Sequence, residues 1–560
     1  MTRPRYDAVI VGGGHNGLVA GFYLARAGLR TLVLERREFV GGCCVTEEFA
    51  PGFRASTGAY VISMLRGSIW RDLRLAEQGV VVDPAGPSLN LYGDGATLHV
   101  HDNVELTQRE FARFSRADAA ALPHFEAELG RLAELIAPLI DSSPPDAGGR
   151  RPRDLARLAK LGLRAARRRA LIDDASFLFS TSATQYLAER FSSEHVMAAL
   201  GWHAINDSVA GPSTPGTAYV LLHDHASEQA AGGIRRWGFV RGGIGLVTEA
   251  MAAAARDAGA EIRTAAQVES VTVDDGRTVG VKLQGGEEVR AARVLSNADP
   301  KTTFLDLVDA DVLPAAFVGA VRAYRCEGTS MKINLGVDAL PAARAVDGDG
   351  MQPYHRGIVE INTTLAEMDV AQAEARAGRP ARDPHVELCI PTVHDAALAP
   401  EGHHVVTIDV NSQPYRLADR SWDEIRDKVA DRAIEIVGEH FPNLPDSIIH
   451  RQVLSPLDLE RVLGISGGHA LHGDMAFDQL FNLRPVRGWA DYRTPVRGLY
   501  LCGAGTHPGG GVTGANGRNC AREVLRDARA LRVRRALRRA APGPRTRAGD
   551  ESLQPAQAAR

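Results

Sequence analysis

The segment near the N-terminus that most constrains the fold reads DAVIVGGGHNGLVAGFYLARAG. Residues 8–11 are apolar and predict a short buried strand; Gly12, Gly14 and Gly17 predict a turn, and residues 18–27 predict a helix. In such a unit the first glycine allows the tight turn, the second lets a pyrophosphate approach the backbone, and the third lets helix and strand pack closely. Free N–H groups at the helix N-terminus then bind the phosphates.

The following segment strengthens this interpretation. Residues 31–34 predict a second strand that ends at Glu35, about 20 residues beyond the glycines, where an acid accepts the ribose hydroxyls of a dinucleotide. An acid at this position disfavours a 2'-phosphate. The alternative, a membrane-spanning helix over residues 8–25, needs about 20 mostly apolar residues, and the glycines interrupt that run. We therefore expect a Rossmann-type nucleotide-binding unit.

A glycine doublet then gives the first family resemblance. The spacing Glu35-x5-Gly41-Gly42-x3-Thr46 resembles the extension found in flavin enzymes of the amine oxidase and phytoene desaturase superfamily. The stretches GFRASTGAYV and VLSNADP resemble the segment that passes the flavin ring and the strand that returns to the cofactor domain. The resemblance implies that the cofactor is FAD, held permanently.

The second half of the flavin site is expected near the C-terminus, in GLYLCGAGTHPGGGVTGANGRNC. This stretch predicts a strand, a loop with seven glycines between Gly503 and Gly517, and a helix from about Val512. A helix N-terminus supplies N–H donors and partial positive charge to the negative end of a reduced flavin. Gly503, Gly511 and Val512 are therefore predicted to contact FAD, and the resemblance implies that the backbone of Val268 covers the adenine.

We expect an α/β chain (α+β overall), in which a Rossmann-type FAD-binding domain is interleaved with a substrate domain built on a mixed, largely antiparallel sheet with helices. Predicted strands at 330–337, 386–391 and 404–411 form part of that sheet. A later glycine turn lacks the full fingerprint because residue 248 is Thr, which argues against a second, NAD(P)H-binding domain. The predicted segments are 1–75, 236–300 and 495–530 for FAD, 76–235 and 301–494 for substrate, and 531–560 for a disordered, arginine-rich tail.

Composition excludes several classes of protein. The formal net charge of -3 does not predict a nucleic-acid partner, and the 44% hydrophobic content allows large cores. The six cysteines include no Cys-x-x-Cys or Cys-x4-Cys pair, since Cys43 and Cys44 are adjacent and the others are scattered; disulfide redox chemistry is not expected. The motifs His223-Asp224-His225 and His469-x-x-His472 lack the companion acids and cysteines of a usual metal site, so no metal is expected. The oligomeric state is not predicted.

One segment carries many cations. Residues 150–169 hold nine Arg or Lys against one acid, interspersed with leucines, which predicts a basic amphipathic helix over about 150–172. Such a helix can lie on an anionic membrane surface, or it can be a solvated cap helix. The chain is expected to be cytoplasmic, with peripheral membrane contact through this helix as the alternative.

Four further stretches narrow the resemblance: STPGTAYVLLHDH, ELCIPTVHDAALAPEGHHVV, SPLDLERVLGISGGH and LYLCGAGTHPGGGVTGANGRN. They resemble the group of pyridine nucleotide-disulfide oxidoreductase domain-containing protein 2, and bacterial β-carotene ketolases are similar in GHNGLV and GRNCAR. The resemblance implies an FAD-dependent oxidoreductase that removes a hydride from a carbon of an apolar or amphipathic small molecule, as phytoene dehydrogenases do. The alternatives are a β-carotene ketolase-like enzyme and a flavin-containing regulatory protein that acts through a protein partner.

Catalytic residues are less well defined by the sequence. Tyr60 follows the segment expected to pass the flavin, Trp237 precedes a glycine turn, and His507 lies in the C-terminal glycine loop. Each is a candidate to face the flavin. For Tyr60 and Trp237 the alternative role is aromatic packing, and for His507 it is a hydrogen bond to loop backbone.

Overall fold

The computed structural model describes residues 6–146, 152–166, 169–205, 208–227, 237–348 and 350–540. Five parallel strands form the first sheet, in the order β19-β13-β1-β2-β9. Their bounds are Leu499–Leu501, Val294–Ser296, Ala8–Val11, Thr31–Leu34 and Glu261–Arg263. They come from three separate parts of the chain, so this sheet is assembled from the three segments predicted for the FAD-binding domain.

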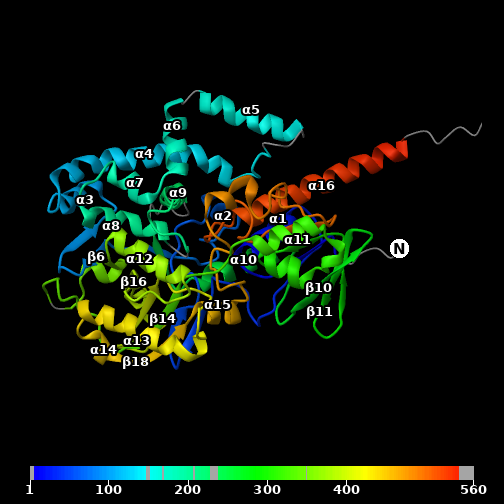
Figure 1. Cartoon of the computed structure of the whole chain (residues 1–560). Helices are drawn as coiled ribbons and strands as arrows, with labels where there is room; N and C mark the ends of the chain where they lie inside the picture. The colour runs from blue at the N-terminus through cyan, green and yellow to red at the C-terminus, as the bar shows by residue number, and fades with distance from the viewer. Residues whose placement is uncertain are drawn as a thin grey trace, which may run out of the picture.

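Helices cover one face of this sheet and a small sheet covers the other. Helices α1 (His15–Arg26), α10 (Gly245–Asp257) and α16 (Ala515–Ala540) share one core with Ile10 and Val33. The three-stranded sheet of β10 (Val268–Asp274), β11 (Arg277–Leu283) and β12 (Glu288–Arg290) packs on the opposite face, together with α11 (Ala315–Ala323). Figure 1 shows α1, α10, α11 and α16 gathered on one side of the molecule.

The second unit is built on a seven-stranded sheet of order β18-β14-β17-β16-β15-β6-β7. All its pairings are antiparallel except the parallel pair β15–β6, so the expected mixed, largely antiparallel sheet is present. The bounds are Ile448–Leu454, Met331–Val337, His404–Val410, Val386–Cys389, Val359–Asn362, Ser88–Tyr92 and Thr97–Val100.

The two faces of this sheet differ in polarity because side chains alternate along each strand. Ile333, Leu388 and Ile408 face the apolar core beneath helix α13 (Trp422–His440). Lys332, Glu387 and the other residues of the alternate register carry mostly polar side chains. The polar face is the one that lies toward the cavities described below.

A helical layer covers the remainder of the second unit. Its helices are α3 (Val104–Phe111), α4 (Arg116–Ile140), α6 (Arg169–Ser180), α7 (Ala183–Ala188), α8 (Glu194–Gly201), α9 (Ala218–Ser227) and α12 (Leu365–Arg376). They share an apolar core around Phe125 and Tyr186. None of the helices in the described part of the chain has the length and apolar character needed to cross a bilayer.

The single basic helix expected over 150–172 is not present. The chain forms α5 (Pro152–Ala166) and then α6 (Arg169–Ser180), and Figure 1 shows the two running in different directions. The physical reason is that they dock on different partners. Leu178 of α6 is buried in the helical core, whereas Arg157 of α5 lies 3.3 Å from Glu523 of α16.

The predicted start of the tail at 531 also needs correction. Helix α16 continues to Ala540, because its Ala-, Leu- and Arg-rich sequence has high helix propensity. The remainder of the predicted tail, 541–560, lies outside the described residues.

Candidate functional site

The N-terminal glycine turn opens one end of a large cavity. Gly12 has a φ of +95°, and a Cβ added at Gly17 would lie 2.2 Å from the Gly12 carbonyl oxygen, so the close approach of α1 to β1 requires a glycine at position 17. No side chain caps α1 at Gly14. The first N–H groups of the helix are thus left for another acceptor, as a pyrophosphate-binding helix requires.

Glu35 lies at the carboxyl end of β2, beside this turn. Its side chain is buried, and its Oε2 accepts a hydrogen bond from the Gly13 N–H at 2.7 Å, while Oε1 accepts one from the Arg37 N–H at 2.9 Å. The acid therefore fixes the turn and also lines the cavity. A carboxylate oxygen has a second lone pair, so Glu35 can accept a hydrogen bond from a ribose hydroxyl as well.

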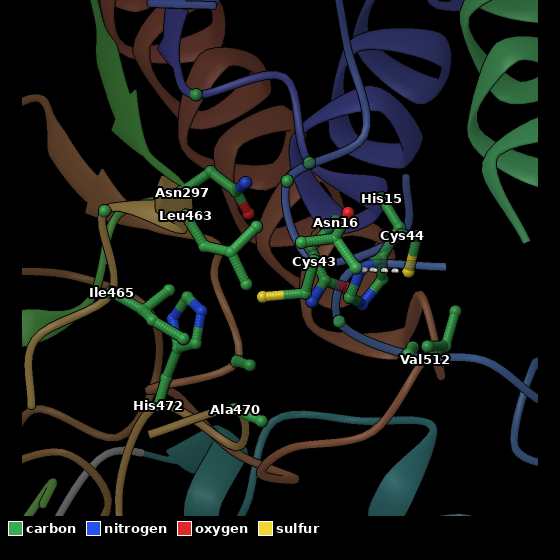
Figure 2. A pocket seen from close by; sticks show the side chains of 18 of the residues that line it. His15, Asn16, Cys43, Cys44, Asn297, Leu463, Ile465, Ala470, His472 and Val512 are labelled. Atoms are coloured by element: carbon green, nitrogen blue, oxygen red, sulfur yellow. Dashed lines mark hydrogen bonds between the residues drawn. The ribbon is translucent and has the colours of Figure 1, made fainter. Parts of the chain in front are cut away.

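The cavity has a volume of about 410 Å³ and extends from Glu35 to the polar face of the seven-stranded sheet. We call it the flavin cavity. Figure 2 shows side chains from the N-terminal turn, from residues 463–472 and from the C-terminal loop surrounding it. Seven of the residues predicted to bind the cofactor line it: Gly12, Gly14, Glu35, Gly42, Val268, Gly511 and Val512.

The three other residues predicted to bind the cofactor lie behind the residues that line the flavin cavity. Gly17 lies at the helix–strand contact described above, and the Gly41 N–H donates to the Gly13 carbonyl at 3.0 Å. A Cβ at Gly503 would lie 2.5 Å from the Asn297 carbonyl oxygen. These glycines permit close backbone packing beneath the cavity, and within the described residues none of them is part of its lining.

The C-terminal loop is an irregular turn rather than the start of a helix. Gly509, Gly511 and Gly514 have φ values of +120°, +90° and +68°, which a helix cannot accommodate, so α16 begins at Ala515 and not near Val512. Asn516 holds the loop, since its Nδ2 donates to the carbonyls of Thr506, His507 and Gly509. No sequence motif pointed to Asn516.

His507 lies away from the flavin cavity. It is 1% exposed, and its Nε2 lies 2.8 Å from the Leu139 carbonyl oxygen at the end of α4. Burial lowers its pKa to about 4. His507 therefore adopts the backbone-binding role that was its alternative, and it joins the glycine loop to the helical layer.

Tyr60 and Trp237 do line the cavity. The Tyr60 hydroxyl donates a hydrogen bond to Glu387 Oε1 on β16.

Lys332 of β14 also lines the cavity, although no sequence motif pointed to it. Its Nζ lies 4.3 Å from the centroid of the Tyr60 ring and donates a hydrogen bond to the Gly58 carbonyl. Burial lowers the pKa of Lys332 to about 8, although neighbouring Asp409 opposes this shift. A lone lysine in the apolar strand MKINLGV was the signal for this residue.

Two histidines and two cysteines complete the wall of the flavin cavity. His15 Nδ1 lies 3.8 Å from Cys44 Sγ, shown as the dashed contact in Figure 2, and Cys43 projects toward the cavity centre opposite His472. Burial lowers the pKa values of His15 and His472 to about 4. Both imidazoles are therefore neutral at pH 7 and can each donate and accept one hydrogen bond.

These features match a known family. The sequence profile described as "Flavin containing amine oxidoreductase" matches residues 17–525. The chain belongs to this family. It is 40% identical over 549 residues to the pyridine nucleotide-disulfide oxidoreductase domain-containing protein 2 of Rattus norvegicus, with 94% of each chain covered, which confirms the resemblance of the four stretches.

More distant relatives agree. A limonene dehydrogenase component from Castellaniella defragrans is 27% identical, with 93% of this chain and 94% of the relative covered. A solved putrescine oxidase superposes with a TM-score of 0.59 at 16% identity, covering 94% of this chain and 99% of the oxidase, and shares the fold. The chain is an FAD-dependent oxidoreductase of the amine oxidase type, and the cavity residues fit FAD.

Proposed function

We propose that this oxidoreductase removes a hydride from a carbon of an apolar or amphipathic small molecule, in the manner of a phytoene dehydrogenase. The observation that carries the proposal is a second cavity of about 160 Å³, which shares Ser63 and Trp237 with the flavin cavity. Its walls include Phe125, Leu129 and Leu221. A cavity with apolar walls on one side and polar side chains such as Glu360 on the other suits an amphipathic organic substrate, whereas a flavin with a regulatory role needs no such space.

Each part of the flavin cavity has a role in this proposal. The α1 N-terminus and Glu35 would hold the pyrophosphate and ribose, and the loop at Gly511 and Val512 would hold the flavin end of the cofactor. When bound, FAD supplies a two-electron acceptor. Tyr60 and Trp237 position the substrate and exclude water.

The Castellaniella relative supports dehydrogenation of an apolar molecule, because it is named as a limonene dehydrogenase subunit. Ketone formation, as in a β-carotene ketolase, begins with the same removal of a hydride from carbon and remains the second candidate within this reaction type.

The first experiment is anaerobic stopped-flow absorbance of the purified holoenzyme. We expect rapid bleaching of the flavin by a terpene, polyene or lipophilic amine from a screened set, and no bleaching by NADPH or NADH, because the chain has a single dinucleotide fingerprint. Dithionite provides the control for a reducible flavin. Rapid bleaching by a pyridine nucleotide would overturn the proposal and indicate a reductase or oxygenating enzyme.

We also propose peripheral membrane contact through α5. Leu155 and Leu163 on this helix are 55% and 57% exposed, although both are large apolar side chains. A lipid-soluble substrate reaches such an enzyme from a membrane surface, and an exposed basic, leucine-bearing helix is suited to that surface. The cytoplasmic location remains a prediction.

A further inference from the structure

Four charged side chains form one row across the seven-stranded sheet. The strand register pairs Lys332 with Asp409, Asp409 with Glu387, and Glu387 with Glu360. Directly paired residues project from the same face of a sheet, with Cβ atoms about 4.5–5.5 Å apart. Neighbours in the row are therefore within reach of a direct or water-mediated hydrogen bond.

This charged row connects the two cavities. Lys332 and Asp409 line the flavin cavity, and Glu360 lines the second cavity. Glu387, between them, accepts the hydrogen bond from Tyr60, whose ring also lines the flavin cavity. Asp102 lines the second cavity and is exposed, so the far end of the path reaches the protein surface.

Burial favours the protonated form of the two glutamates of the row. Glu387 and Glu360 are 3% and 2% exposed. Burial raises the pKa of Glu360 to about 8, and burial together with neighbouring Asp409 raises the pKa of Glu387 well above its usual range. The geometry gives a second reason for the raised pKa values: the row holds three adjacent carboxyl groups and one lysine, and a single positive charge cannot neutralise three carboxylates.

Other titratable groups face the row at both ends. His203 lies near Glu360, and His385 Nε2 is 3.0 Å from Glu360 Oε2. Burial lowers the pKa of His385 to about 3, so this imidazole is neutral. Cys43 and Cys389 lie near Lys332, and burial raises the pKa of the Cys389 thiol. His385 therefore supplies no positive charge to Glu360.

We propose that the charged row is a proton relay between the flavin cavity and the second cavity. The proposal rests on the oxidation proposed above. Hydride removal breaks one C–H bond of the substrate, and the hydrogen leaves with both bonding electrons to the two-electron acceptor that bound FAD would supply. Formation of the new double bond breaks a neighbouring C–H or O–H bond and releases a proton in the flavin cavity.

The charged row can carry that proton and hold the same number of protons before and after the transfer. Asp409 accepts the proton at the flavin cavity. Glu387 accepts it on one carboxyl oxygen and gives its own proton from the other, and Glu360 repeats the exchange and releases a proton into the second cavity. One proton enters and one leaves, and the same path in reverse supplies a proton when the flavin is reduced artificially.

Infrared difference spectroscopy of the FAD-loaded protein tests the relay without a known substrate. The flavin is photoreduced with EDTA as the electron donor, in H2O and in D2O, and the C=O stretch of protonated carboxyl groups is recorded. Because each glutamate regains a proton once the transfer is complete, the spectra are recorded with time resolution after a photoreducing flash, and we expect transient, deuterium-sensitive bands from both glutamates in the wild type. The variants are Glu387→Gln and Glu360→Gln, and the matched control is Thr407→Val, a buried neighbour on the same face of β17.

The relay predicts an asymmetric result. Glu360→Gln removes one band and leaves the Glu387 band, whereas Glu387→Gln removes both, because the Glu360 proton can then no longer exchange with the flavin cavity. Thr407→Val retains both. The relay is refuted if the Glu360 band still responds in Glu387→Gln, as a purely electrostatic response would, or if no carboxyl band responds in the wild type. Either result leaves the proposed oxidation intact, since that is tested separately by substrate bleaching.

Discussion

Glu35 tests how much one residue of the nucleotide-binding motif contributes to FAD binding. Glu35→Gln keeps the size of the side chain and an acceptor for the Gly13 N–H, but removes the charge that faces the ribose. Because a hydrogen bond to a charged acceptor contributes about 1.5–3 kcal/mol, we expect FAD to bind roughly 10- to 100-fold more weakly. The recovery of FAD fluorescence on dilution measures the dissociation constant. Glu38→Gln, an exposed neighbour, is the control and should bind FAD normally.

Gly17 tests the close contact of α1 with β1. A Cβ in Gly17→Ala would meet the Gly12 carbonyl oxygen at 2.2 Å, so backbone must move. We expect a loss of about 1–3 kcal/mol in the free energy of unfolding, together with loss of bound FAD. Gly130→Ala is the matched control, because Gly130 lies within α4 and its Cβ would meet nothing within 4 Å. That variant should gain up to about 1 kcal/mol in urea unfolding. Equal stability of the two variants would contradict the packing argument.

At the scale of elements, the sequence correctly predicted those turns and strands whose conformation is set by interactions over a few residues. The turn at Gly12, the strand ending at Glu35 and the strands near 331, 386 and 404 are present because glycine geometry and apolar runs act over a few residues. The start of α16 was misplaced, because three glycines with positive φ delay it to Ala515. The break between α5 and α6 depends on tertiary partners, which periodicity does not contain.

Helix α5 gives a prediction at this scale. Leu155→Glu combined with Leu163→Glu removes two exposed apolar side chains, each contributing about 1.5–3 kcal/mol when fully buried in lipid. We expect at least tenfold weaker binding to vesicles containing anionic lipid, measured by co-sedimentation, with unchanged flavin absorbance. Val370→Glu, at an exposed position on α12, is the control and should bind vesicles as the wild type does. If the wild type does not sediment with vesicles, α5 is a solvated cap helix.

At the scale of the whole molecule, the sequence could not predict which residues meet. Lys332, Asp409, Glu387 and Glu360 are far apart along the chain, and each is a single charge within an apolar strand. They become a row only through the strand order and register of the seven-stranded sheet. Motif reasoning therefore located the cofactor end of the site, whereas the substrate end required the assembled fold.

The buried histidines predict how the whole molecule responds to acid. Burial lowers the pKa of His507 to about 4 from an ordinary value of 6.5. As the pH falls below 6.5 the unfolded chain binds a proton that the folded protein does not bind, so the stability contributed by the neutral, buried His507 is present above 6.5 and is lost toward about 4. One pKa unit corresponds to about 1.4 kcal/mol. The contribution of His507 to the free energy of unfolding should therefore fall by roughly 2 kcal/mol between about pH 7 and pH 5.

The variant His507→Gln isolates this effect, because glutamine can still donate to the Leu139 carbonyl but does not titrate. Urea unfolding over the acid range should show that its free energy of unfolding falls less steeply than that of the wild type, by about 2 kcal/mol over two pH units. His124→Gln, at an exposed position on α4, should follow the wild-type curve. Parallel curves for wild type and His507→Gln would show that His507 is not held neutral, and the contact that joins the glycine loop to α4 would then have to accommodate an imidazolium.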